Sequence, residues 1–125
     1  MTQKKINKKY SIQVNEVKAR KAKICLQNNL ADIGSTSDWA RLCMCSRTQL
    51  HQIINNYYGV TPANMISRAR YKRIITMLYE NPDMTSSYAA YKVGLRDEQG
   101  MYKFLSRKYG TNFTELRYCI INHRI

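Results

Sequence analysis

The sequence predicts an all-α protein built from two similar halves that one long helix joins. Three observations favour this fold class. Only two prolines and five glycines occur in 125 residues, while Lys, Arg, Leu, Ala and Gln, which suit helices, are frequent. Apolar residues recur at helical intervals. A pattern of helix starts and stops also returns after about 50 residues, which indicates an internal repeat.

Length and charge limit the classes of partner. A chain of 125 residues has room for one domain, or for two very small ones that share a core. Its 21 Lys and Arg against 8 Asp and Glu give a net charge of +13, which favours an acidic polymer or an anionic membrane as partner. Without a run of about 18 apolar residues or a signal peptide, we expect a cytoplasmic protein that does not span a membrane.

The chain begins with a basic segment. Residues 1–23 hold eight Lys and Arg and one Glu, a net charge of 8 − 1 = +7. We expect residues 1–10 to be a flexible tail that adds long-range attraction, and a solvated tail without a specific role fits equally well. The lysines of this tail are Lys4, Lys5, Lys8 and Lys9.

A helix is predicted over residues 11–29, because its apolar residues return at helical intervals. A polar linker follows over residues 34–37, and Ser37 or Asp38 is expected to cap the next short helix. The apolar residues of the first helix are Val14, Val17, Ile24 and Cys25.

Two longer helices follow. Ser46 is expected to cap a helix that Gly59 stops. Pro62 then opens a helix over residues 62–81, since proline misses no N–H bond in a first turn, and Pro82 prevents its continuation. The apolar stripes of these helices are Leu50, Ile53, Ile54 and Tyr57, then Met65, Ile66, Ala69, Ile74, Met77 and Leu78.

The second half shows the same pattern of helix-starting and helix-stopping residues. Thr85 or Ser86 is expected to cap a short helix that Gly94 breaks. Asp97 caps the next helix, Gly110 stops it, and one more short helix closes the chain.

The two halves match position by position. Each reads as a short helix, a tight turn, a capped longer helix and a glycine stop, which is the helix-turn-helix layout whose second helix enters the DNA major groove. The shift is 50 residues before the turn and 51 after it. The matching residues are Ala40, Ser46, Leu50, Ile53 and Gly59 in the first copy, and Ala90, Asp97, Met101, Phe104 and Gly110 in the second.

The long helix suits a pair of such units. Some 20 residues span roughly 30 Å, close to the roughly 34 Å between successive major-groove faces. We therefore predict homeodomain-like helix-turn-helix subdomains over residues 11–62 and 82–125, joined by a linker helix over 62–81. A chain that carries both units would bind as a monomer or weak dimer. The alternative is a helix that merely scaffolds a bundle.

Several short motifs stand in a fixed order: Trp39-Ala40-Arg41-Leu42, Ser46 with Leu50, Gly59-Val60-Thr61-Pro62, Arg70, Ala89-Ala90-Tyr91-Lys92-Val93-Gly94-Leu95 with Asp97, and Lys108-Tyr109-Gly110 with Glu115 and Arg117. In this order and spacing, residues 37–117 resemble the DNA-binding domain of the AraC family of bacterial transcription regulators. The resemblance implies two units that dock on adjacent major grooves of double-stranded DNA and work with RNA polymerase. The chain has no room for a sensing domain, so it is similar either to the short stand-alone members or to an excised output domain.

The resemblance also implies contact residues. The positions that read bases are Thr48, His51 and Gln52 in the first unit, and Glu98, Gln99, Gly100 and Lys103 in the second. These residue types can recognise adenine, guanine, cytosine and thymine edges. Candidates for phosphate contacts are Arg47, Arg96, Arg107 and Lys108. For the charged residues the plainer interpretation is a solvated surface charge, and for His51 a surface histidine.

Some positions depart from the family pattern. Gln52 stands in place of a common Arg, and Asn55-Asn56 in place of a frequent basic pair, which predicts a weak phosphate grip in the first unit. Met44 occupies a turn position often held by Gly, where a positive φ is costly. Gly100 lies in the second recognition helix, at a cost of about 1 kcal/mol relative to Ala, but it would allow close approach to DNA.

Two other functions compete with DNA reading. A module that kept the fold, lost sequence reading and acts through protein–protein interaction is favoured by Gln52 and by Asn55-Asn56. An enzyme is disfavoured, because His51 and His123 are the only histidines and neither a nucleophile–base constellation nor a Gly-rich phosphate loop occurs. A basic amphipathic membrane binder fits the charge but not the many internal helix stops.

The four cysteines are expected to be free thiols that pack as small apolar groups. They are Cys25, Cys43, Cys45 and Cys119. Cys43-Met44-Cys45 with His51 is the one metal-like cluster, but its thiol spacing is too short for a usual zinc site and no second pair stands nearby. We expect neither a metal nor a cofactor.

Overall fold

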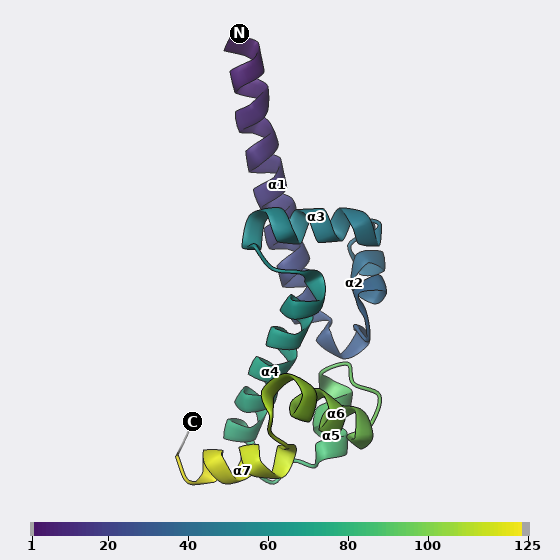
Figure 1. The fold of residues 1–125 in the computed structure, drawn as a ribbon, viewed down its shortest axis with the longest axis vertical. Helices are drawn as coiled ribbons and strands as arrows, with labels where there is room; N and C mark the ends of the chain where they lie inside the picture. Colours follow the sequence, from purple (N-terminus) through teal and green to yellow (C-terminus); the bar gives the residue numbers. More distant parts are fainter. Residues whose placement is uncertain (1, 124–125) are drawn as a thin grey trace.

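The computed structural model describes the backbone of residues 2–123 and the side chains of residues 14–123. Over these residues the chain forms seven α-helices and one short 3₁₀ helix, without a strand (Figure 1). The all-α fold class predicted from the sequence is therefore confirmed. The elements are α1 (Thr2–Asn28), η1 (Leu30–Asp32), α2 (Thr36–Leu42), α3 (Arg47–Tyr58), α4 (Pro62–Glu80), α5 (Ser86–Lys92), α6 (Glu98–Tyr109) and α7 (Phe113–Ile121).

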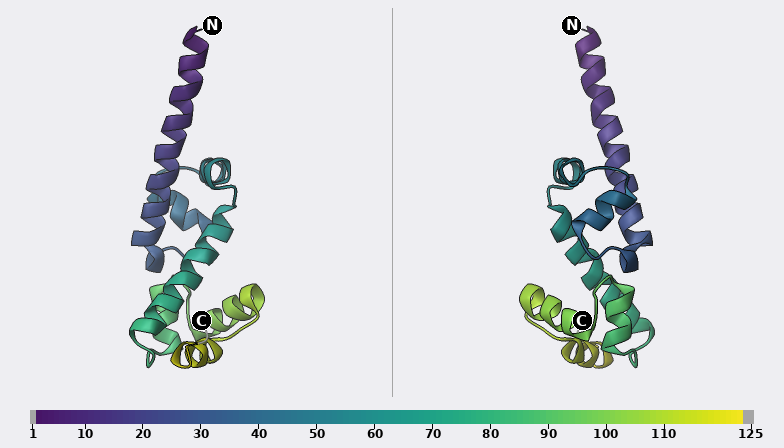
Figure 2. Two further views of the ribbon diagram at one scale, coloured as in Figure 1. Left: turned by 90° about the vertical axis from the view of Figure 1, so that its left-hand side faces the viewer. Right: turned by 90° about the vertical axis from the view of Figure 1, so that its right-hand side faces the viewer.

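Helix α4 is a rod between a first unit, made of α1 to α3, and a second unit, made of α5 to α7 (Figure 1). Its 19 residues span about 28 Å at about 1.5 Å per residue. Helices α3 and α6 both project from the same side of this rod, and α1 rises past α3 in the direction away from the second unit (Figure 2). Buried apolar side chains from every helix form one continuous core, so the two units are held in a common packing arrangement.

The ends of most helices follow from local chemistry, as the sequence predicts. At the caps of α3, α4, α5 and α6 the side-chain oxygen accepts the backbone N–H three residues later. The glycine after each recognition helix adopts the left-handed conformation, with φ of 70° at Gly59 and 61° at Gly110. The confirmed caps are Ser46, Thr85 and Asp97, and Thr61 caps α4 in the same way just before Pro62.

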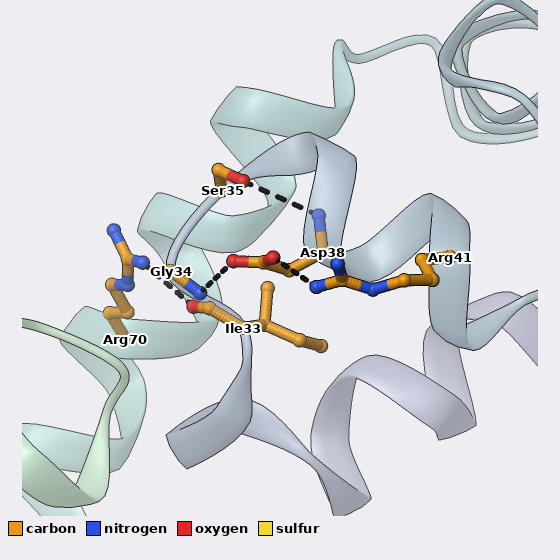
Figure 3. Close-up of polar contacts among 6 residues, drawn as sticks. All are labelled: Ile33, Gly34, Ser35, Asp38, Arg41 and Arg70. Atoms are coloured by element: carbon orange, nitrogen blue, oxygen red, sulfur yellow. Dashed lines mark hydrogen bonds and ion pairs between the residues drawn. The ribbon is translucent and has the colours of Figure 1, made fainter.

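The cap of α2 differs from the prediction. Neither Ser37 nor Asp38 caps this helix, and Ser35 does so instead by accepting the Asp38 N–H at 3.3 Å (Figure 3). The Asp38 carboxylate is already engaged, because it accepts the Gly34 N–H at 3.0 Å and pairs with Arg41. The helix therefore begins earlier than predicted, and Asp38 lies in its first turn, where a carboxylate is favourable.

Helix α1 is present, but it starts at Thr2 rather than near residue 11. The predicted flexibility of residues 1–10 stays a prediction, and the side chains of Lys4, Lys5, Lys8 and Lys9 lie outside the described ones.

The face of α1 that meets the core is also not the one its larger apolar residues indicate. Val17 and Ile24 are about half exposed, whereas the small residues Ala19 and Ala22 are buried with Leu26. Small side chains let other groups reach the α1 backbone: the indole N–H of Trp39, itself fully buried, donates to the Ala22 carbonyl oxygen at 2.9 Å.

The stripe of α3 needs one correction. Leu50 and Ile54 are fully buried as predicted, but Tyr57 is 40% exposed. Its hydroxyl donates to the Glu16 carboxylate at 3.2 Å and accepts from the Arg20 guanidinium at 3.4 Å. The phenol oxygen needs polar partners, and these lie at the rim between α1 and α3.

Candidate nucleic-acid interface

The turn of the first unit joins α2 to α3 through Cys43, Met44 and Cys45. The Cys45 N–H donates to the Ala40 carbonyl oxygen at 3.0 Å, which closes the turn. Met44 adopts a φ of 58° and its side chain is 93% exposed, so the costly positive φ expected at this position is present. Ser46 then forms a reciprocal capping box with Gln49, which fixes where α3 begins.

The second unit repeats this geometry. The Leu95 N–H donates to the Ala90 carbonyl oxygen at 2.9 Å, and Gly94 has a φ of 79°. Asp97 caps α6 by accepting the Gly100 N–H at 2.8 Å. The internal repeat predicted from the sequence is thus confirmed in the hydrogen bonds and in the positive φ of both turns.

Helix α3 buries Leu50 and Ile54 and turns its polar residues outward. The predicted base-reading residues Thr48, His51 and Gln52 are all exposed. Together with Arg47 they line a hollow of about 680 Å³ between α3, the start of α2 and the start of α4. The structure therefore gathers the four residues predicted for the first unit on one surface. The other residues of this hollow, which we call the α4-side hollow, are Thr36, Thr61, Pro62 and Ala63.

Helix α6 buries Met101, Phe104 and Leu105. Its predicted base-reading residues Glu98, Gln99 and Lys103 are exposed, whereas Gly100 is half-buried in the first turn. A Cβ at Gly100 would stand 3.4 Å from the Asp97 carboxylate, an ordinary contact, so this glycine is not required by crowding. The predicted phosphate contacts Arg96, Arg107 and Lys108 are also exposed, at the two ends of the helix.

The two outward faces differ in charge. Arg47 is the one Lys or Arg in α3, while α6 holds Lys103, Arg107 and Lys108 beside Glu98. Among the described side chains, the ion pairs are Glu16 with Arg20 and Asp38 with Arg41. The basic residues of α3 and α6 are therefore not neutralised by protein carboxylates and can meet phosphate oxygens.

One half-buried cation joins the two units. Arg70 of α4 donates from its Nε to the Val93 carbonyl oxygen at 2.9 Å. Its terminal nitrogen donates to the Ile33 carbonyl oxygen at 2.9 Å (Figure 3) and to the Gly94 carbonyl oxygen at 3.3 Å. Burial lowers the pKa of Arg70 from its ordinary value, but guanidinium stays charged at any physiological pH. The bonds join the segment before α2 to the turn before α6, so Arg70 helps set the spacing of both recognition helices.

A second hollow, of about 670 Å³, lies on the opposite flank of α3, between that helix, the turn of the first unit and α1. Lys18 and Lys21 of α1 line it and are exposed. The sequence reasoning did not single out these lysines, although their three-residue spacing on a helix places them on one face. We call this surface the α1-side hollow.

The thiols at this hollow are packed as predicted. Cys25, Cys43 and Cys45 are half-buried against the core. Burial raises the pKa of the Cys43 thiol to about 12, so it is protonated at neutral pH. No group of three or more His, Cys, Asp and Glu side chains that could hold a metal ion occurs in the part of the chain that the structure describes.

The chain was compared with known protein families. A family model described as a helix-turn-helix domain matches residues 39–118, which include both turns, both recognition helices and the whole of α4. No curated protein and no solved structure matches the chain. Within residues 2–123, every helix is too short or too polar to cross a membrane.

Proposed function

The chain belongs to the AraC-type helix-turn-helix family, and on this premise we propose that it is a sequence-specific DNA-binding transcription regulator that inserts α3 and α6 into adjacent major grooves. The observation that carries the proposal is that two capped helices project from the same side of one rod (Figure 2) and that most of their predicted contact residues are exposed. The length of the rod, about 28 Å, is close to the roughly 34 Å pitch of B-DNA.

The contacts divide into two kinds. Gln52 and Gln99 suit adenine, Lys103 suits guanine and Glu98 suits cytosine, because their donors and acceptors complement the major-groove edges of those bases. Thr48 can present its methyl group to thymine. The further base-reading positions are His51 and Gly100, and the phosphate contacts are Arg47, Arg96, Arg107 and Lys108.

The wider role follows the family. We propose that the protein works in the bacterial cytoplasm with RNA polymerase and binds double-stranded DNA as a monomer or weak dimer. The two helix-turn-helix units and their linker would act as subdomains of one DNA-binding domain. A monomer suffices because one chain already supplies two recognition helices, and the rod between their units, about 28 Å long, is close to the spacing that single-unit proteins reach by dimerisation.

Selection of bound duplexes from random DNA, followed by titration of the preferred duplex at several salt concentrations, tests the proposal. Six to eight phosphate contacts predict a slope of log affinity against log salt of roughly −5 to −7. We expect Gln52→Ala and Lys103→Ala each to weaken binding to the preferred duplex about 10-fold or more and to relax the preference at one base pair.

The matched control is Gln27→Ala, which removes the same side chain as Gln52→Ala from an exposed position on α1. It should leave affinity and preference unchanged. If the wild-type protein binds every duplex equally well, sequence reading has been lost, and a role through protein–protein interaction is the better account.

A further inference from the structure

Helix α3 stands as a ridge between two hollows of similar size, one of about 680 Å³ on the α4 side and one of about 670 Å³ on the α1 side. Gln52 lines both, so it marks the crest of the ridge. A helix that lies in a major groove has a phosphate strand on either side of it. Each hollow is therefore positioned to face one of the two strands.

The α1-side hollow offers donors to an anion. Its cations are Lys18 and Lys21 of α1, and carboxylates are absent from its described lining. Burial raises the pKa of the Cys45 thiol, and the ammonium of Lys18 opposes that rise, which places Lys18 beside the turn of the first unit. The remaining polar residues of the lining are the amides Asn15, Gln49, Gln52 and Asn56.

The neighbouring cations of α1 are used differently. Arg20 pairs with Glu16 at 2.9 Å, and the ammonium of Lys23 lies 5.2 Å from the centre of the Tyr58 ring. Neither lines the hollow. Lys18 and Lys21 are thus set apart from these two residues, whose charges serve the packing of α1 on α3.

We propose that Lys18 and Lys21 bind the DNA phosphate strand on the side of the first recognition helix that faces away from the second unit. The inference rests on the proposed function and adds a contact surface to it. It also explains how α3 can lack the basic pair that is frequent in the family, where this chain has the uncharged Asn55 and Asn56. Helix α1 supplies two cations across the hollow from Asn56 instead.

The direction of α1 extends the contact. The helix backbone continues from this hollow past the first unit and away from the second (Figures 1 and 2). If the DNA axis runs parallel to the line that joins α3 and α6, then α1 follows the duplex beyond the first recognition site. The footprint on DNA should accordingly be longer on the side of the first unit.

The test compares Lys18→Gln/Lys21→Gln in the full chain with the wild type on the preferred duplex. Glutamine keeps helix propensity and removes charge. We expect the salt slope to become shallower by about 1.8, or about 0.9 per lysine, and affinity to fall about 30-fold at about 0.15 M salt. Lys23→Gln, which removes one charge from another face of α1, should leave the slope unchanged.

Two further measurements locate the contact. Ethylation of phosphates beyond the first recognition site should impair binding of the wild type but not of the double variant. Shortening the duplex at that end should weaken only the wild type. An unaltered slope in the double variant, or ethylation interference that persists in it, would overturn the inference while selective wild-type binding still supports the proposed function. Equal binding of the wild type to all duplexes would instead reject that function.

Discussion

The two helix-turn-helix units have similar backbone conformations, but different residues occupy the position of positive φ in their turns. Met44 and Gly94 occupy equivalent positions, and both have positive φ, 58° and 79°. Around Met44 there is open solvent, so the side chain is tolerated at the cost of backbone strain. Gly94 instead packs under η1, where a Cβ would stand 2.5 Å from the Leu30 carbonyl oxygen and closer still to that of Ile33.

This difference shows that the glycine of the second unit serves the contact between the units as well as the turn. Gly94 and Val93 present carbonyl oxygens to Arg70, and the same guanidinium reaches Ile33 beside the first unit. The first turn faces solvent and the α1-side hollow, so it has no such constraint. Equivalent positions in a repeat can therefore have very different tolerance to substitution.

The largest expected effect on stability comes from a separate substitution at each of the two turn positions. Gly94→Ala should destabilise the protein by about 3 kcal/mol or more, since it combines a positive φ with overpacking against η1. Met44→Gly should stabilise by about 0.5 kcal/mol, because relief of strain slightly exceeds the entropy that glycine adds to the unfolded chain. Urea unfolding of both variants measures the contrast, and equal effects at the two positions would contradict it.

The next effect concerns the link between the units. Arg70→Met should lower the free energy of unfolding by about 2 to 3 kcal/mol, because it leaves the carbonyl oxygens of Ile33 and Val93 without their charged donor. Hydrogen exchange should show loss of protection both around Ile33 in the first unit and in the turn at Gly94 in the second. Arg68→Met, at an exposed position of the same helix, is the control. A loss of protection confined to one unit would argue against Arg70 as a link.

The smallest expected effect on stability comes from the position before each positive-φ residue, which is a thiol in the first unit and an aliphatic side chain in the second. Cys43 corresponds to Val93, so Cys43→Val should change stability near pH 7 by less than about 1.5 kcal/mol. The native thiol keeps its proton up to a pKa of about 12, while the unfolded thiol loses it near 9.0. The unfolded state therefore binds fewer protons between these values, and stability falls as pH rises through that window.

Replacing the thiol should make this decline less steep, by well under about 1.4 kcal/mol per pH unit because Cys43 is only half-buried. Urea midpoints measured from pH 8 to 11 provide the readout, and Cys119→Val, a half-buried thiol of α7, is the control. An identical decline in the wild type and Cys43→Val would show that the thiol makes no contribution.

Much of the fold was predictable because helix ends are decided locally. Ser46 and Asp97 cap through a hydrogen bond to the third residue after them, and Gly59 and Gly110 stop their helices through their own φ. Two helix starts were not predicted. Helix α1 begins at Thr2. In α2, Ser35 is the cap because the Asp38 carboxylate accepts the Gly34 N–H, which the sequence does not show.

The candidate site was predictable only in part. The resemblance indicated residues of α3 and α6 that are exposed, apart from the half-buried Gly100. It did not indicate Lys18 or Lys21, because a lysine in a basic segment looks the same whether it meets solvent or lines a hollow. The larger apolar residues of α1 were equally misleading, since the core covers Ala19 and Ala22 rather than Val17.

By itself, the sequence determined where most helices begin and end and that two similar units exist, and its net charge favoured an acidic partner, because caps, glycine stops and net charge act over a few residues or over the whole composition. Only the tertiary structure decided which side of α1 is covered, that α3 and α6 share one side of the rod, and that Gly94 cannot bear a side chain. Those outcomes depend on contacts such as Trp39 with Ala22 and Arg70 with Ile33. Such contacts join residues far apart in the chain, and no local pattern encodes them.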